Sequence, residues 1–262
     1  MSSFIQHLGD LLRYRELIKN LVARDLKARY KNSFLGFAWS LLNPLMMMVV
    51  YTVVFSILLR NNTPNFPVFV MIGLLPWQLT VGSVMGSMNS IVGNGHLIKK
   101  VYFPREILPI SMVMSNTVNF LLATTVLVAL LLVFHVALSP LVLYFPIILA
   151  MHLIFLLGLA LFFSSLNVFF RDTEVIMEAV ILAWMFLTPL FYNIEDLSAT
   201  YARIIYILNP LASIISTYRL ILLYNSAPAW DFLLRTFLTC AVVFAIGYLF
   251  FLHRASQFGE EV

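Results

Sequence analysis

The sequence predicts an all-α membrane protein with six transmembrane helices, an amphipathic helix near its start and a short cytoplasmic helix between the second and third spans. Of its 262 residues, 61% are hydrophobic and only 11% are charged, whereas soluble domains carry roughly 25% charged residues. Six apolar segments have about the length that a helix needs to cross a bilayer core of roughly 30 Å. No repeat or low-complexity linker divides the chain, so we expect a single membrane domain over 1–262.

The six predicted spans alternate with polar and turn-forming segments. We expect helices throughout, because a segment inside the bilayer must satisfy its own backbone hydrogen bonds. Five spans fall within 34–192, and the sixth falls within 232–262 together with a short tail. The predicted bounds are Phe34 to Leu59, Phe66 to Val92, Ile107 to Phe134, Leu141 to Phe169, Val175 to Tyr192 and Phe232 to Leu252.

The distribution of positive charge predicts the orientation of these spans. Twelve of the sixteen Lys and Arg residues fall on one side of the predicted membrane and four fall on the other. Cytoplasmic loops are normally the more positive ones, so we expect both termini and the segment 94–106 to lie in the cytoplasm. The even number of spans agrees with this orientation.

Charge and residue content exclude several classes of function. Seven of the sixteen cations lie between Arg13 and Lys31, so the formal charge of +4 is a local excess and does not indicate a nucleic-acid partner. The only cysteine is Cys240, which excludes an internal disulfide and a cysteine-based metal site. No carboxylate pair, histidine cluster or activated nucleophile falls within the spans. We expect no catalytic residue, metal ligand or cofactor in this chain, while an ATP-independent channel stays open as an alternative.

The region 1–33 is predicted to form a cytoplasmic helix that lies along the inner leaflet. From residue 14 to residue 30, apolar side chains recur at helical spacing and cations occupy the remaining circumference. The apolar positions are Leu17, Ile18, Leu21, Val22 and Leu26. The sequence therefore predicts a helix with one face buried and one face charged.

Asp25 falls within this apolar stripe, and Arg29, four residues later, is its expected ion-pair partner. One interpretation is a simple ion pair near the end of the helix. The other is that Arg24, Lys27 and Arg29 contact an ATPase partner or the diphosphate of a lipid head group, because clustered cations at a membrane surface attract phosphates.

The segment 94–106, between the second and third spans, combines apolar anchors with cations. This is the composition of a docking surface, because aromatic and arginine side chains dominate interface energetics. The chain has no G-x-x-x-x-G-K-[ST] motif, so any ATP would have to act through a partner that binds such a surface. An ordinary loop whose cations only fix the topology is an equally open interpretation. The candidate coupling residues are His96, Leu97, Ile98, Lys99, Lys100, Tyr102, Phe103, Arg105 and Glu106.

Five blocks of sequence, in order along the chain, resemble the motifs of one known family. They are RDLKARYKNSFLG at 24–36 with Trp39 and Asn43-Pro44-Leu45, GLLPW at 73–77, the segment 94–109, LNVFFRD at 166–172 and NPL at 209–211. The first and third blocks are the most specific. Together they resemble the ABC type-2 permeases that export polysaccharides, and the resemblance covers nearly the entire chain.

This resemblance implies a half-transporter that works as a homodimer with two separate ATPase subunits in a bacterial plasma (inner) membrane. ATP and Mg would be bound by the ATPase subunits, and segment 94–106 would be the coupling helix. The cargo would be a lipid-linked glycan of the O-antigen, capsule or teichoic acid type, handled among membrane lipids. An exporter of a small drug or lipid with the same architecture is the alternative, which neighbouring glycosyltransferase genes would argue against.

The segment 193–231 is too interrupted to form one comfortable span. Its pattern predicts two short helices hinged at Asn209-Pro210 that re-enter the outer leaflet, or else a helix pair lying on that surface. The resemblance implies that this segment caps the outer side of the export path. Aromatic residues gather here, either as an interfacial belt or as walls on which sugars pack. The candidate pore or outer-gate residues are Phe191, Tyr192, Tyr201, Tyr206, Asn209, Pro210 and Tyr218.

Few polar groups fall within the spans. Gly82 and Gly86 have the spacing of small residues at which helices pack closely. Six other polar side chains either line the export path or hold helices together, and interhelical hydrogen bonds are the favoured interpretation. These six are Asn116, Asn119, Thr124, Thr125, His152 and Asn167.

Overall fold

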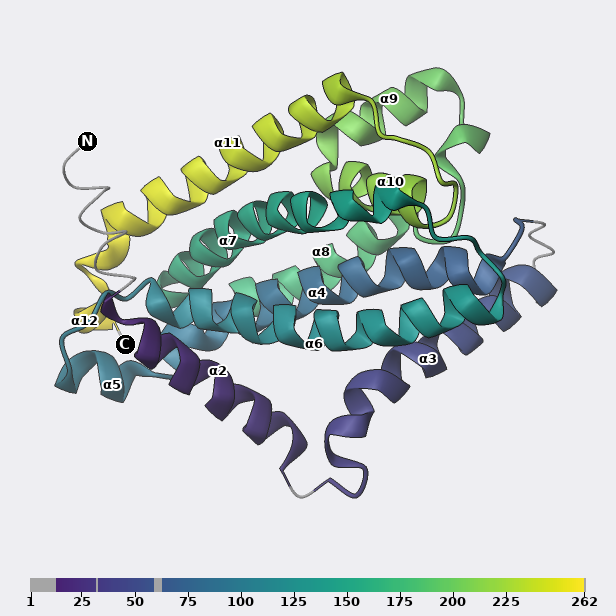
Figure 1. The fold of residues 1–262 in the computed structure, drawn as a ribbon. Coiled ribbons are helices and arrows are strands. Elements are labelled where there is room, and N and C mark those ends of the chain that lie inside the picture. The colour runs from purple at the N-terminus through teal and green to yellow at the C-terminus, as the bar shows by residue number, and fades with distance from the viewer. Residues whose placement is uncertain (1–12, 32, 59–62, 262) are drawn as a thin grey trace.

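The computed structural model describes residues 13–31, 33–58 and 63–261, and within these ranges it is helical and contains no β-strand. The prediction of an all-α fold is therefore confirmed. Figure 1 shows the helices as one elongated bundle. Their bounds are α2 (Arg15–Tyr30), α3 (Trp39–Thr52), α4 (Phe66–Val92), α5 (Gly95–Lys100), α6 (Ile107–Val133), α7 (Phe145–Phe169), α8 (Thr173–Leu187), α9 (Ala199–Leu208), α10 (Pro210–Leu222), α11 (Trp230–Ala255) and α12 (Phe258–Glu261).

Five helices in the described part of the chain are long and apolar enough to cross a membrane. They are α4, α6, α11, α3 with its π-helical continuation to Leu58, and α7 with the tight turn that precedes it from Pro140. The chain is therefore a multi-pass membrane protein. The predicted spans at α4 and α6 match the structure to within one residue.

The central helix of the bundle is α4. In its most apolar stretch 78% of residues are buried, compared with 11% in Trp39–Leu58 and 22% in α11. α6 and α7 flank α4, α11 packs along α7, and α3 packs against α4 (Figure 1). The long peripheral helices α3 and α11 expose many apolar side chains, as expected where a helix faces lipid or another chain.

The two ends of the bundle carry different short helices. α2 begins at the left end in Figure 1, where α5, α12 and the last turns of α11 also lie, whereas α9 and α10 lie at the opposite end. α9 and α10 meet at an angle of 109°, and Asn209 between them is extended. The predicted break at Asn209-Pro210 is confirmed, and Pro210 fits at the first position of α10 because the amide it lacks has no partner within a helix there.

The first span begins later than the sequence predicts. Phe34 is fully exposed, and a tight turn over Gly36–Ala38 precedes α3, which starts at Trp39. Gly36 has a φ of +50°, a conformation that glycine adopts readily and other residues adopt rarely. Gly36 therefore allows the chain to change direction between α2 and the first span.

The predicted fifth span, Val175 to Tyr192, is shorter in the structure. α8 ends at Leu187 after 15 residues, which is about 22 Å at the rise of an α-helix and less than the roughly 30 Å of a bilayer core. Thr188 is extended (ψ 133°) because Pro189 follows it, and a residue before proline avoids the helical conformation. The predicted helical residues 188–192 instead form the start of the α8–α9 connection.

A close approach between α7 and α11 involves two glycines that were not predicted from the sequence. A Cβ on Gly247 of α11 would lie 2.0 Å from the carbonyl oxygen of Gly158 in α7. The predicted close packing at Gly82 is also confirmed, because a Cβ there would lie 2.6 Å from the Asn116 side chain of α6. Small residues thus fix the contact of α7 with α11 and of α4 with α6.

Candidate functional site

The predicted coupling segment is only partly helical. α5 ends at Lys100, and Val101 is extended (φ −131°, ψ 133°), so the expected helix through Tyr102 and Phe103 is wrong in its second half. Pro104 disfavours a helical conformation just before it, and successive side chains in an extended chain point to opposite sides. Tyr102 is accordingly 96% exposed, whereas Phe103 is only 6% exposed.

Phe103 anchors the coupling segment to the bundle. It belongs to a buried cluster with Leu21 of α2 and with Ile107 and Leu108 of α6. Leu97 and Ile98 pack against the same cluster, and Ile98 also contacts a second cluster that contains Phe258 of α12. The anchored side therefore joins α2, α5, α6 and α12.

The opposite side of the coupling segment faces outward. His96, Lys99 and Lys100 are exposed, Arg105 is half-buried and Glu106 is buried at 7% exposure. This arrangement presents an exposed tyrosine and two lysines on a base that packing holds in place. The structure thus separates the nine candidate coupling residues into an outward-facing group and an anchored group.

α2 is tied to the coupling segment by a side-chain hydrogen bond. The Arg24 guanidinium donates to the side-chain oxygen of Asn94 at 3.0 Å, and the Asn94 amide donates to the backbone carbonyl of Ser90 at 2.8 Å. Asn94 is 7% exposed and lies directly before α5. Arg24 therefore links α2 to the junction of α4 and α5.

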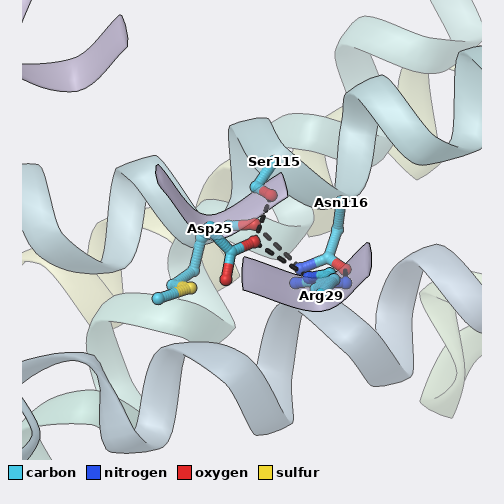
Figure 2. Close-up of polar contacts among 5 residues, drawn as sticks. Asp25, Arg29, Ser115 and Asn116 are labelled. Atoms are coloured by element: carbon cyan, nitrogen blue, oxygen red, sulfur yellow. Dashed lines mark hydrogen bonds and ion pairs between the residues drawn. The ribbon is translucent and has the colours of Figure 1, made fainter. Parts of the chain in front are cut away.

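A polar contact joins α2 to the inside of the bundle (Figure 2). The predicted Asp25–Arg29 ion pair is confirmed, with Arg29 Nε 2.9 Å from Asp25 Oδ2. Asp25 also accepts a hydrogen bond from the hydroxyl of Ser115, and Arg29 Nη1 donates to the side-chain oxygen of Asn116 at 2.9 Å. Ser115 and Asn116 lie more than two turns into α6, about 12 Å from its start. α2 therefore contacts α6 well inside the bundle and not only at its end.

A cavity of about 630 Å³ lies beside this contact, between α3, α4 and α6. Its walls combine aromatic and aliphatic side chains with amides, hydroxyls and one cation. They include Arg29, Trp39, Ser40, Asn43, Tyr51, Trp77, Gln78, Asn116, Asn119 and Phe120. Rings and amides together suit a ligand that carries both apolar faces and hydroxyl groups.

At the other end of the bundle, Asn209 connects α10 to α8. It is 6% exposed, its side-chain oxygen accepts from Trp184 Nε1 at 3.0 Å and from the Ala212 amide, and its amide donates to Thr188 Oγ1 at 2.9 Å. Asn209 thus caps α10 and holds it to α8 and the residue that follows α8. Pro210, next to it, is buried as well.

The aromatic residues predicted for an outer gate occupy different environments. Phe191 is 4% exposed and stacks on Phe55 at 4.4 Å, and Tyr218 is 1% exposed among the rings of Phe120 and Phe145. Both are packing residues within this chain. By contrast, Tyr201 is 66% exposed.

Tyr192 and Tyr206 are half-buried. The Tyr206 hydroxyl donates to Ser216 at 3.2 Å, and its ring packs edge-on against Phe232 at 5.2 Å. The gate role of all these residues stays a prediction, and among the aromatic residues proposed for the gate Tyr201 is the one that is mostly exposed.

A buried cation at this end was not recognised from the sequence. Arg219 of α10 is 4% exposed and donates to the carbonyl oxygens of Pro189, Leu190 (2.7 Å) and Phe69 (3.4 Å). Its guanidinium carbon lies 3.5 Å from the centre of the Phe69 ring. The signal was present in the sequence, because an arginine inside an apolar run must find partners, but the sequence does not show which carbonyls provide them.

Three of the six intramembrane polar residues, Asn116, His152 and Asn167, join two helices, as predicted. His152 of α7 lies 2.9 Å from the Thr80 hydroxyl of α4, and Asn167 donates to the Met88 carbonyl at 3.0 Å. Thr124 and Thr125 differ from the prediction, because their hydroxyls bond to carbonyls within α6. Among the residues that the structure describes, no group of three or more His, Cys, Asp or Glu side chains could hold a metal ion.

Comparison with known proteins identifies the family of this chain. The family model described as "ABC-2 type transporter" matches residues 16–223, a range that runs from the start of α2 to just past the end of α10. This chain belongs to the ABC-2 type transporter family. The resemblance seen in the sequence is therefore confirmed at the level of the family.

Individual ABC-2 relatives match over almost their whole length. The O-antigen export system permease protein RfbA of Myxococcus xanthus is 34% identical over 259 residues, which cover 98% of this chain and 100% of that protein. Two proteins of the same name from Klebsiella pneumoniae are 33% and 34% identical over 246 residues, covering 94% of each chain. The matched region thus includes both the coupling segment and the α9–α10 end of the bundle in this member of the family.

Proposed function

We propose that this chain is the membrane subunit of an ATP-driven exporter that moves a lipid-linked polysaccharide of the O-antigen type out of the cytoplasm. The observation that carries the proposal is the match over 98% of the chain to a relative named as an O-antigen export permease. A drug exporter of the same architecture is the weaker candidate, because none of the three relatives above carries such a name.

The cavity between α3, α4 and α6 supports a hydroxyl-rich cargo. Its rings offer flat apolar faces, and its amides offer both donors and acceptors. Arg29 lines this cavity, and Lys27 on the same helix is exposed and makes no ion pair with any described residue. We infer that Lys27 and Arg29 meet the diphosphate of the lipid carrier while the glycan enters beside them.

Energy enters through a separate ATPase in this proposal. The chain has no phosphate-binding loop motif, and Tyr102 with Lys99 and Lys100 forms an exposed docking face on an anchored base. ATP and Mg would bind in the ATPase, and its closure would push α5. Because Phe103 and Arg24 tie this segment to α2 and α6, the push would move α2 and α6 together.

The working assembly would be a homodimer with two ATPase subunits in a bacterial inner membrane. The end that carries α2, α5 and α12 would face the cytoplasm, in line with its excess of cations. Large exposed apolar faces on α3 and α8 give a second copy a surface on which to pack.

Export in a defined system tests the proposal. A strain that lacks this permease and displays no surface glycan would be complemented with the wild-type gene and the gene of its ATPase. We expect surface glycan to return only when both genes are present and the ATPase can hydrolyse ATP. Glycan display without the ATPase, or with an ATPase that cannot hydrolyse ATP, would refute it.

A further inference from the structure

A second cavity, of about 900 Å³, lies on another face of the bundle and plays no part in the proposed export path. It is bounded by the coupling segment, by α6, and by the last turns of α7 and α11. Its mouth and its interior have different chemistry, and both parts are lined by described residues.

The mouth of this cavity is cationic. Arg13, Lys99, Lys100 and Arg105 line it, and Glu106 is the single carboxylate among the lining residues. None of the four cations forms an ion pair with a described residue. The mouth therefore carries a net positive charge, because the one carboxylate of Glu106 can balance only one of the four cations.

The interior of the cavity is apolar and runs along the bundle. Leu157 and Leu161 of α7 and Phe244 of α11 line it. Leu157 lies 12 residues before the end of α7 and Phe244 lies 11 residues before the end of α11, which places both about 17 Å from the cationic end. This depth is close to one leaflet, since half of a bilayer core is about 15 Å.

We propose that this cavity binds one anionic phospholipid of the leaflet at the α5 end, with its phosphate at the cationic mouth and its acyl chains along α7 and α11. Basic pockets between membrane helices bind such head groups. The lining contains none of the amide side chains found in the cavity beside Arg29, so it suits a phosphate and hydrocarbon better than a sugar. A soluble ATPase does not reach one leaflet deep, which argues against a segment of the ATPase as the occupant.

The site would make the coupling segment sensitive to membrane composition. Lys99, Lys100 and Arg105 belong to the segment that the proposed function assigns to ATPase coupling, and only this consequence rests on that proposal. A bound phosphate would neutralise part of their charge and hold the segment against α7 and α11. Lipid binding itself is measurable without transport, so its failure and the failure of the export proposal are distinguishable.

The experiment uses the purified complex of permease and ATPase in nanodiscs made from equal parts of phosphatidylglycerol and phosphatidylcholine. The lipid that each chain retains on release from the nanodisc is measured by native mass spectrometry. We expect wild type to retain phosphatidylglycerol in preference to phosphatidylcholine. Arg13→Gln should reduce that preference about fivefold, as expected for one cation near a phosphate. Its control, Arg15→Gln, removes an equal charge from a residue outside the cavity and should leave the preference unchanged.

A second pair of variants tests the apolar interior. Leu157→Trp fills the cavity and should abolish retention of both lipids, whereas Leu249→Trp, at a position that is 65% exposed and outside the lining, should not. Equal retention by these two variants, or no preference for phosphatidylglycerol in wild type, would overturn the proposal. Displacement of phosphatidylglycerol by undecaprenyl diphosphate, or its retention only when the ATPase is absent, would overturn it too. If the Leu157→Trp permease does not assemble with the ATPase, the comparison of Arg13→Gln with Arg15→Gln decides whether the proposal holds.

Discussion

Alanine substitutions at two neighbouring residues of the coupling segment are expected to have different effects, one on ATPase binding and the other on folding stability. Tyr102 is 96% exposed and Phe103 is 6% exposed, although both are aromatic and adjacent. Tyr102→Ala should weaken ATPase binding and leave folding intact, whereas Phe103→Ala should destabilise the permease itself. A double substitution would mix the two effects, so the single variants are required.

The magnitudes follow from burial. Phe103 lies in a closed cluster with Leu21, Ile107 and Leu108, and truncating such a phenylalanine costs about 3–5 kcal/mol in free energy of unfolding. Tyr102→Ala should change that free energy by less than about 0.5 kcal/mol, as exposed substitutions do. If Tyr102 is a main anchor for the ATPase, its loss should cost about 2 kcal/mol of binding, which is about 30-fold in affinity.

The assay compares thermal unfolding of the purified permease with affinity for the ATPase, both in the same detergent. Tyr201→Ala serves as the control, because Tyr201 is an exposed aromatic of α9 and α9 lies at the opposite end of the bundle (Figure 1). This variant should change neither quantity. The reasoning is refuted if Tyr102→Ala binds the ATPase like wild type, or if Phe103→Ala unfolds at the wild-type temperature.

Three further substitutions test the contacts that hold the helices in place. Asp25→Ala removes the ion-pair partner of Arg29 and should lower the free energy of unfolding by about 1–2 kcal/mol, between the values for exposed and buried pairs, seen as a lower midpoint in thermal unfolding. Gly247→Ala places a methyl group 2.0 Å from the Gly158 carbonyl oxygen and should abolish the monodisperse peak in size-exclusion chromatography. Arg219→Gln loses charged hydrogen bonds to backbone carbonyls and should lower stability by at least about 1.5 kcal/mol, with faster proteolysis in the connection after α8.

Each of these variants has a matched control in the same chain. Lys27→Ala removes an exposed charge from α2 without breaking an ion pair to a described residue, Gly86→Ala meets its nearest atoms at 3.8 Å, and Arg203→Gln changes an exposed arginine. These three should behave like wild type in the corresponding assays. The structural account fails for any pair in which the control is as damaging as the test variant.

Several features of the fold were predictable because they depend on residues close together in the sequence. The bounds of α4 follow from a largely apolar run of membrane-spanning length that contains no charged residue. The bend after α9 follows from Asn209-Pro210, because proline has no amide hydrogen to donate and its ring clashes with the preceding helical turn. The ion pair of Asp25 with Arg29 follows from helical spacing alone.

The candidate site was predictable in composition and only partly in arrangement. The sequence marks the segment 94–106 as aromatic and basic, yet it does not show that Tyr102 faces outward while Phe103 is buried. That difference arises because α5 stops at Lys100 and the next residues are extended. The coupling, lipid and gate roles of the individual residues stay predictions.

The sequence by itself determined that this is a multi-span helical membrane protein of the ABC-2 type, because length, hydropathy and short motifs are properties of contiguous segments. Only the tertiary structure decided which distant residues meet: Arg24 with Asn94, Asp25 with Ser115, Gly158 with Gly247, and Arg219 with the carbonyls after α8. Such contacts depend on how each helix is rotated and how deeply it is placed against its neighbours. Packing of the whole bundle sets both quantities, and a pattern along one helix does not encode them.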